Sequence, residues 1–405
     1  MAATRAGPFL LGWIAVVMLS SHAYGAFVLA FAWVNAAVGI CFGLFPALAS
    51  RSAEEKDRSA QSTADLIRLG MSLICGLALL AAVLGLLSDG SAYLAVAPAL
   101  ATGWACLSLG CSCFLAILCW SLGLNKPLVG LTLLESFLHA LWLMTCGIFA
   151  WDVFVIMLGL GTISALVSSG FLLILIQDDP SLLKALSLTG DQAKPSKFTS
   201  LLGPNLSNTL AMSATPALAL TITAMRGPAL NIEVLFGVGM LLLSAGLFPL
   251  QVITLKQSQK LIRFRGASAK SDNQSLYRSE WAYICLALVW GIAFAGLVIW
   301  IGPLILSVSA TPFTVLQPYL PHIAWIGAGW AFLAAAGPVL QAQYRYQTWF
   351  IINIAGCISL LVYAGFGPLS AGMLLIGTSL SVLVRCGFAA TALSGRVKLK
   401  SQVES

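Results

Sequence analysis

The sequence predicts an all-α integral membrane protein with about twelve transmembrane helices, arranged as two parallel-repeat six-helix bundles around a central cavity. Three observations predict this: the composition, the length of the apolar runs and an internal repeat. Hydrophobic residues make up 59% of the 405 residues and charged residues only 9%, whereas a soluble domain carries about 25% charged residues. Lipid must therefore be the main solvent, and a chain in lipid has to satisfy its backbone within helices or closed barrels. The apolar runs reach about twenty residues without alternation, so helices are expected.

The first apolar run follows Arg5 and imitates a signal peptide. Hydrophobicity resumes directly after Ser20-Ser21-His22, however, so two linked membrane helices explain the segment better, the first of them short for a full span. In chain order the predicted spans are 8–22, 25–48, 67–87, 93–120, 128–150, 153–176, 202–225, 230–255, 282–306, 322–341, 349–365 and 369–393.

The basic residues set the predicted orientation. Of the 21 Lys and Arg residues, 18 fall on one side of the predicted spans, mostly in loops 49–66, 177–201 and 256–281 and in the tail 394–405. By the positive-inside rule this side is the cytoplasm, so both termini are predicted to be cytoplasmic, in a bacterial inner membrane. The net charge of +7 is accounted for by these orienting loops, and no nucleic-acid partner is expected.

An internal repeat divides the chain. The tetrapeptide Gly-Leu-Phe-Pro at 43–46 recurs at 246–249, 203 residues later, and each copy ends an even-numbered span before a charged loop. Six spans per half keep both copies in the same orientation, as in parallel-repeat transporters. The sequence therefore predicts an N-terminal six-helix lobe at 1–190, a cytoplasmic linker at 191–201, and a C-terminal lobe with a basic tail at 202–405.

The sequence contains no recognisable catalytic or cofactor-binding arrangement. It has no phosphate-binding loop, and its ten cysteines lie within apolar runs with no CxxC or Cys/His ligand spacing. The three histidines are far apart along the chain. We therefore expect a protein that is not an enzyme and that holds no metal or cofactor, leaving open its coupling to a proton or sodium gradient.

Ionisable residues within apolar runs are the strongest functional candidates, because each costs about 2.5–3.5 kcal/mol at a helix centre on insertion scales. Arg385 lies deep in the last run, and Glu135 and His139 share one face of the fifth span. Arg385 is expected to face the cavity. Glu135 and His139 form either a proton-responsive pair at the cavity wall or a mutually satisfied pair between helices.

Three further polar residues complete the candidate set for the substrate cavity. Arg226 precedes Gly227-Pro228 at the outer end of the seventh span, where a long side chain can reach the interface. Asn35 and Asn353 are uncharged polar residues within spans, which either line the transport path or bond across helices.

Several segments resemble one transporter family. They are Ser-Ser-His-Ala-Tyr-Gly-Ala-Phe-Val-Leu at 20–29 leading to Gly-Leu-Phe-Pro-Ala-Leu at 43–48, Met-Arg-Gly-Pro at 225–228, and Gly-Phe-Gly-Pro-Leu-Ser-Ala-Gly at 365–372. Over essentially its full length the chain resembles Wzx-type polysaccharide repeat-unit flippases of the multidrug/oligosaccharidyl-lipid/polysaccharide exporter superfamily.

This resemblance implies two bundles that alternate between inward and outward openings and move undecaprenyl-pyrophosphate-linked oligosaccharides to the periplasmic leaflet. The implied partners are membrane lipid, the polyprenyl-linked glycan and polysaccharide assembly proteins. A pyrophosphate is well matched by arginine. Two departures from the family pattern stand out, namely the few basic residues within the spans and the short first helix.

Other functions stay open. An ion-coupled exporter of the multidrug-and-toxin type would use a buried carboxylate, for which Glu135 is the deep candidate. A lipid II flippase is the third candidate among transporters. A membrane-embedded transferase would need an acid or base beside a donor-binding loop, and only the Glu135–His139 pair offers one. A structural scaffold would leave Arg385 and Glu135 unexplained.

The predicted topology can be tested by labelling single cysteines in a protein stripped of its ten native ones. A membrane-impermeant thiol reagent added from outside should reach Asp89→Cys and miss Ser268→Cys, because only the second lies in a predicted cytoplasmic loop. The opposite labelling pattern would refute the orientation.

Overall fold

A computed structural model describes residues 11–54, 60–87, 96–182, 198–226, 232–267, 273–308, 314–343 and 345–403. These residues form α-helices joined by short turns, together with one short 3-10 helix. Residues 11–18 are helical, and the further elements are α2 (Ser21–Glu54), α3 (Ala60–Leu87), α4 (Val96–Ser121), α5 (Asn125–Ile148), α6 (Val153–Asp178), α8 (Phe198–Met225), α9 (Ile232–Ala267), α10 (Asn273–Val308), η1 (Thr314–Tyr319), α11 (Leu320–Ala342), α12 (Tyr346–Phe366) and α13 (Met373–Val403).

The predicted all-helical membrane fold is confirmed, since each of the twelve predicted spans coincides with a helix. Within the described residues nine helices are long and apolar enough to cross a membrane, and Ala211–Met225 and Ile232–Leu247 form shorter apolar helices. Several helices run past their predicted apolar limits. α9 continues to Ala267 and α10 begins at Asn273 because a helix can extend into water after its hydrophobic stretch has ended.

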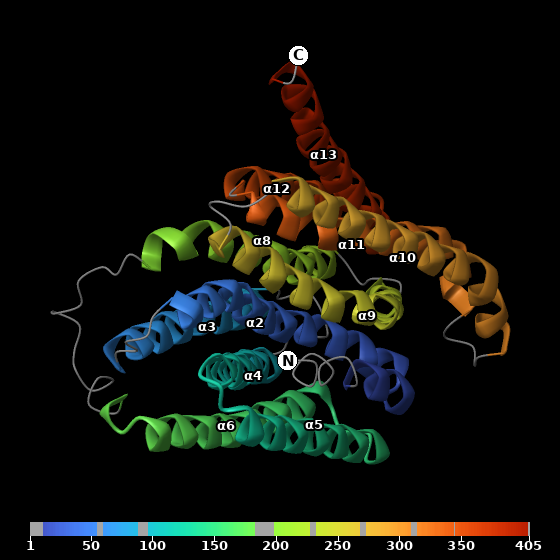
Figure 1. Ribbon diagram of the computed structural model, residues 1–405. Helices are drawn as coiled ribbons and strands as arrows, with labels where there is room; N and C mark the ends of the chain where they lie inside the picture. The colour runs from blue at the N-terminus through green and yellow to red at the C-terminus, as the bar shows by residue number, and fades with distance from the viewer. Residues whose placement is uncertain are drawn as a thin grey trace. The chain divides into compact units, whose positions relative to one another are not determined.

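The chain divides into two compact units, Met1–Pro228 and Ala229–Ser405. In the first unit α4 is the central helix, in contact with α2, α3, α5 and α6 (Figure 1). Its apolar stretch is largely buried, whereas α5 and α6 expose most of theirs, as expected of helices that face lipid. Close packing depends on small residues: a Cβ added to Gly110 of α4 would lie 2.7 Å from Ile74 Cγ2 of α3.

Helix α8 packs along α2 in this unit. The indole Nε1 of Trp33 donates a hydrogen bond of 3.2 Å to Thr221 Oγ1, and Gly39 makes room for Ser213. These contacts group α8 with the first unit, although the repeat predicts it as the first helix of the C-terminal lobe. The predicted linker 191–201 lies largely outside the described residues, and the lobe limits 1–190 and 202–405 stay a prediction.

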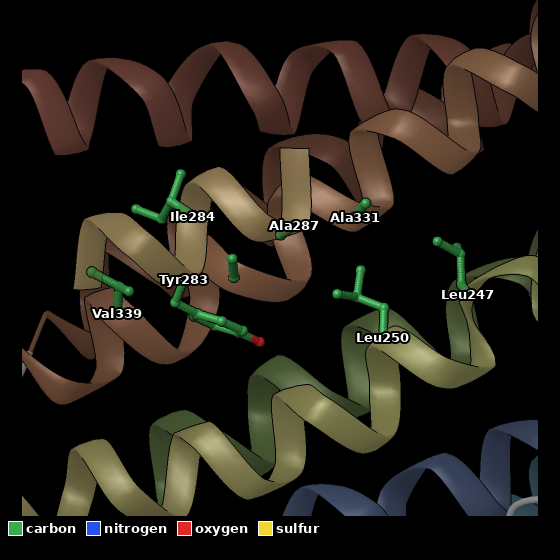
Figure 2. Close-up of a cluster of buried hydrophobic side chains, with 8 residues drawn as sticks. Leu247, Leu250, Tyr283, Ile284, Ala287, Ala331 and Val339 are labelled. Carbon is green, nitrogen blue, oxygen red and sulfur yellow. The ribbon is translucent and has the colours of Figure 1, made fainter. Parts of the chain in front are cut away.

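In the second unit α11 is the central helix, in contact with α9, α10, α12 and α13. Figure 2 shows where α9, α10 and α11 meet in one buried cluster, in which Leu250, Tyr283 and Val339 come from the three helices in turn. A second cluster joins α11 to α12 and α13 through Leu340, Ile352 and other buried residues.

The same contact plan occurs in both units. α4 contacts α2, α3, α5 and α6, and α11 contacts α9, α10, α12 and α13 in the corresponding order; α5 pairs with α6 as α12 pairs with α13. The repeated tetrapeptides lie in α2 and α9, which occupy corresponding places in this plan. The internal repeat of the sequence is therefore a repeat of helix packing.

Two glycines of α10 allow a matched test of the close packing. A Cβ on Gly291 would lie 3.0 Å from both the Cα and the carbonyl oxygen of Ala328 in α11, whereas a Cβ on Gly296 would meet nothing within 4 Å. Gly291→Ala should destabilise the protein by about 1–3 kcal/mol because the two helix backbones must move apart. Gly296→Ala should leave stability unchanged or raise it through helix propensity.

Thermal unfolding of the two purified variants, followed by size-exclusion chromatography in detergent, measures this difference. Equal unfolding temperatures for the two variants would contradict the close α10–α11 contact.

Candidate functional site

The first unit contains a polar cluster where α4, α5 and α6 meet. Glu135 and His139 lie one turn apart on α5, and the structure joins them through Ser164 of α6. Ser112 of α4 completes the set around the carboxylate. We call these four residues the α4–α6 polar cluster. Sequence reasoning predicted its two ionisable members and missed its two serines.

The carboxylate of Glu135 accepts one hydrogen bond on each oxygen. Ser112 Oγ donates to Oε2 at 2.8 Å, and Ser164 Oγ donates to Oε1 at 2.6 Å. The 2.6 Å distance lies in the range of hydroxyl bonds to a charged acceptor, and the 2.8 Å distance is an ordinary hydroxyl–oxygen bond. Two neighbouring helices, α4 and α6, thus each donate one hydrogen bond to the carboxylate.

The imidazole of His139 shares the same serine. Its Nε2 lies 3.0 Å from Ser164 Oγ and 3.1 Å from the carbonyl oxygen of Leu160 in α6. Ser164 has one hydroxyl hydrogen, which the carboxylate takes, so all four contacts are satisfied together when His139 Nε2 carries a hydrogen and donates it. His139 is 4% exposed, and Ser112 and Ser164 are buried.

The second unit buries Arg385 between α12 and α13. The side chain is 5% exposed and lies over Gly356, where an added Cβ would come within 2.8 Å of its Cδ. Among the described residues, Nη2 contacts Cys357 Sγ at 3.7 Å, and Nε has no hydrogen-bond partner. Ser381 Oγ donates to the Gly356 carbonyl at 2.7 Å, closing the same α12–α13 contact. The guanidinium therefore lies against a glycine and a thiol in this unit.

The other predicted residues occupy separate places. Asn353 is fully buried one turn before Gly356 on α12, and its Nδ2 donates to the Trp349 carbonyl at 3.1 Å. Arg226 is half-buried in the turn that ends α8, and Asn35 is exposed on α2. Within the first unit, only Glu135 and His139 of the predicted set are joined by hydrogen bonds to a common partner.

The described residues contain no group of three or more His, Cys, Asp or Glu side chains placed to hold a metal ion. The ten cysteines carry free thiols, eight of them buried or partly buried among α2, α4, α5, α12 and α13. Cys41 Sγ, for example, donates to the backbone carbonyls of Ala37 and Gly110, as a small buried packing residue does.

Comparison with known proteins identifies the fold. No protein-family model and no curated protein matches the chain. Among solved structures, the chain is similar to a multidrug resistance MATE family transporter of the MOP superfamily in its inward-facing conformation, with a TM-score of 0.71, 15% identity, and coverage of 99% of this chain and 96% of that one.

The outward-facing conformation of such a transporter matches with a TM-score of 0.61 and 15% identity over 100% of this chain and 96% of that one. A MATE protein in complex with MaL6 matches with a TM-score of 0.65 and 14% identity, over 100% and 95% of the two chains. The chain therefore has the twelve-helix, two-repeat fold of MATE transporters.

Proposed function

We propose that this protein is an alternating-access membrane exporter of the multidrug-and-toxin type, driven by an ion gradient. The observation that carries the proposal is the end-to-end likeness to MATE transporters in both inward-facing and outward-facing conformations. The sequence resemblance placed a lipid-linked oligosaccharide flippase first and this exporter second. The solved structures support the superfamily that both share and favour the second.

The α4–α6 polar cluster supplies what an ion-coupled exporter needs. Such a protein requires an ionisable group within the membrane whose charge changes when the driving ion binds. Glu135 is a carboxylate in the middle of α5, stabilised only by hydroxyl groups in the contacts described above. A carboxylate without a fixed positive partner can take up and release a cation readily, which suits a coupling group.

A second candidate function is the flipping of polyprenyl-pyrophosphate-linked oligosaccharides. Arg385 favours it, because a buried guanidinium with an unsatisfied Nε can bind an oxyanion once the helices around it open. Under this alternative the partners are membrane lipid, a polyprenyl-linked glycan and polysaccharide assembly proteins. For both candidates the loop charges support a bacterial inner-membrane protein with cytoplasmic termini, and neither function needs a nucleic-acid partner.

Transport by the purified protein in proteoliposomes tests the first proposal. Ethidium should move against its gradient when a proton or sodium gradient is imposed, and Glu135→Gln should lower this rate by about tenfold or more because the amide cannot change charge. Thr145→Ala on the same helix is the matched control, since the Thr145 hydroxyl bonds only to its own helix at Leu141. Full gradient-driven transport by Glu135→Gln would refute the coupling role.

A substitution of Arg385 distinguishes the two proposed functions. Translocation of a fluorescent polyprenyl-pyrophosphate sugar is followed by quenching from outside the vesicles. If the protein flips this lipid, Arg385→Lys should lower the rate by about tenfold because the planar, two-pronged donor is lost while the charge stays. Arg345→Lys is the control, because within the described part of the chain Arg345 donates to the carbonyl of Ala392, for which one donor suffices.

Unchanged lipid translocation by a well-folded Arg385→Lys protein would exclude this arginine from headgroup binding. Ethidium transport without any lipid translocation by the wild-type protein would exclude the flippase alternative.

A further inference from the structure

The hydroxyl of Ser164 is the only atom that the structure places in hydrogen-bond contact with both ionisable groups of the α4–α6 polar cluster, among the residues described. It lies 2.6 Å from Glu135 Oε1 and 3.0 Å from His139 Nε2. A hydroxyl can donate one hydrogen and accept another at the same time. Ser164 can therefore pass a proton from one group to the other without moving its oxygen.

We propose that Glu135, Ser164 and His139 form a proton relay, so that the ion that drives this transporter is the proton. The inference rests on the proposed ion-coupled function and names its ion and its second proton carrier. His139 receives the proton, and Glu135 holds it. Ser164 carries no net charge at any stage.

The transfer balances atom by atom. In the starting state His139 is an imidazolium and Glu135 a carboxylate. The Nε2–H bond breaks as its proton goes to Ser164 Oγ, and the Ser164 O–H bond breaks as its own proton goes to Glu135 Oε1. The products are a neutral imidazole, an intact serine hydroxyl and a carboxylic acid, and the net charge of the three residues is unchanged.

No other charged side chain within the helices that contact α5 competes for this proton. α4 carries no charged residue, and the charges of α5 and α6 apart from Glu135 lie at their ends, at Lys126 and Asp178. The thiols of α4 face other helices. Cys106 donates to the Trp33 carbonyl of α2, and Cys111 to the Met71 sulfur of α3.

The remaining cysteines of α4 and the cysteine of α5 likewise lie at contacts other than the polar cluster. Cys113 lies beside Cys41 of α2, Cys119 lies toward Asp178, and Cys146 is buried near the far end of α5. Within the described residues Glu135 and His139 are thus the ionisable groups of the α5 face that contacts Ser164 of α6.

The chemistry of the cluster suits a proton better than sodium. A sodium ion is held by several oxygen atoms, and here the oxygens bonded to the carboxylate are two serine hydroxyls, which point their hydrogens at it. Imidazole nitrogen is a proton acceptor but a poor sodium ligand. Apart from Glu135, the one carboxylate within α4, α5 and α6 is Asp178 at the end of α6.

The relay also links the protonation of His139 to the hydrogen bonds between α5 and α6. Before transfer, His139 Nε2–H can donate to the Leu160 carbonyl of α6. After transfer Nε2 becomes an acceptor, so Leu160 loses this donor and Ser164 turns its hydroxyl toward His139. Proton movement thus changes the bonds between α5 and α6, which is the kind of local change that biases a conformational equilibrium.

Transport of ethidium in proteoliposomes tests the relay with three serine variants. Ser164→Ala should lower proton-driven transport by about tenfold or more, and Ser164→Thr should restore most of it, because threonine keeps the hydroxyl. Ser112→Ala removes a donor from the same carboxylate without touching His139, and its loss should be smaller. Ser169→Ala is the matched control, because this hydroxyl lies on the exposed side of α6 and bonds only to Ala165.

The histidine and the ion are tested in the same assay. His139→Gln should also lower proton-driven transport by about tenfold, because the amide can still donate to Leu160 but cannot carry a proton. A proton gradient without sodium should suffice for the wild-type protein. Transport driven by a sodium gradient alone, or equal losses in Ser112→Ala and Ser164→Ala, would overturn the relay.

A spectroscopic titration decides the relay without any transported substrate. Infrared difference spectra of the purified protein follow the carboxylic-acid C=O band that Glu135→Gln deletes. His139→Gln should shift the pH midpoint of this band clearly in the wild-type background and less in the Ser164→Ala background, because the two groups are coupled through the hydroxyl. Equal shifts in both backgrounds would overturn the relay. Absent ethidium transport by the wild-type protein would instead refute the drug-exporter function.

Discussion

The structure depends on how closely helix backbones can approach one another in a medium that offers no hydrogen bonds. Lipid provides little hydrophobic driving force for helix association. Van der Waals contact between helices, which small side chains make possible, therefore contributes most of the stability. The central helices α4 and α11 meet this need with glycine and alanine. Gly291 lies against the backbone of Ala328, and Gly110 against Ile74. Where a small residue lets two helices approach closely, neighbouring helices can surround a central one. Polar groups can then be buried at these helix contacts.

The two polar regions follow from this packing. Ser112 and Ser164 reach Glu135 because α4 and α6 pack closely against each other and both contact α5. Arg385 can lie across α12 because residue 356 is glycine and leaves room for its methylene groups. In each unit a small residue or hydroxyl at a helix contact makes space for one ionisable group that would be costly in lipid. Polar function and helix packing therefore share the same residues.

The sequence was sufficient to predict the positions of the helices but not the contacts between them. Apolar runs predicted the long helices of the described residues, because hydropathy records the solvent around a segment. Glu135 and His139 were predicted as a pair since four residues return a helix to the same face. Ser112 and Ser164 were missed because serine is common in membrane helices, and only the packing of α4 and α6 around α5 gives these two a role. For Arg385 the sequence indicated polar surroundings, and the described neighbours are a glycine and a thiol.

The repeated contact plan places Glu135 and Arg385 in corresponding helix pairs, one in α5–α6 and the other in α12–α13. The two groups carry opposite charges, so with neutral His139 their sum is zero. A proton gained by the relay makes the sum positive, whichever member holds it. A membrane voltage acts on a unit charge with about 2.3 kcal/mol per 100 mV across the full field. Voltage therefore acts on one more positive charge in the proton-loaded protein than in the empty one, and the transport cycle becomes electrically asymmetric.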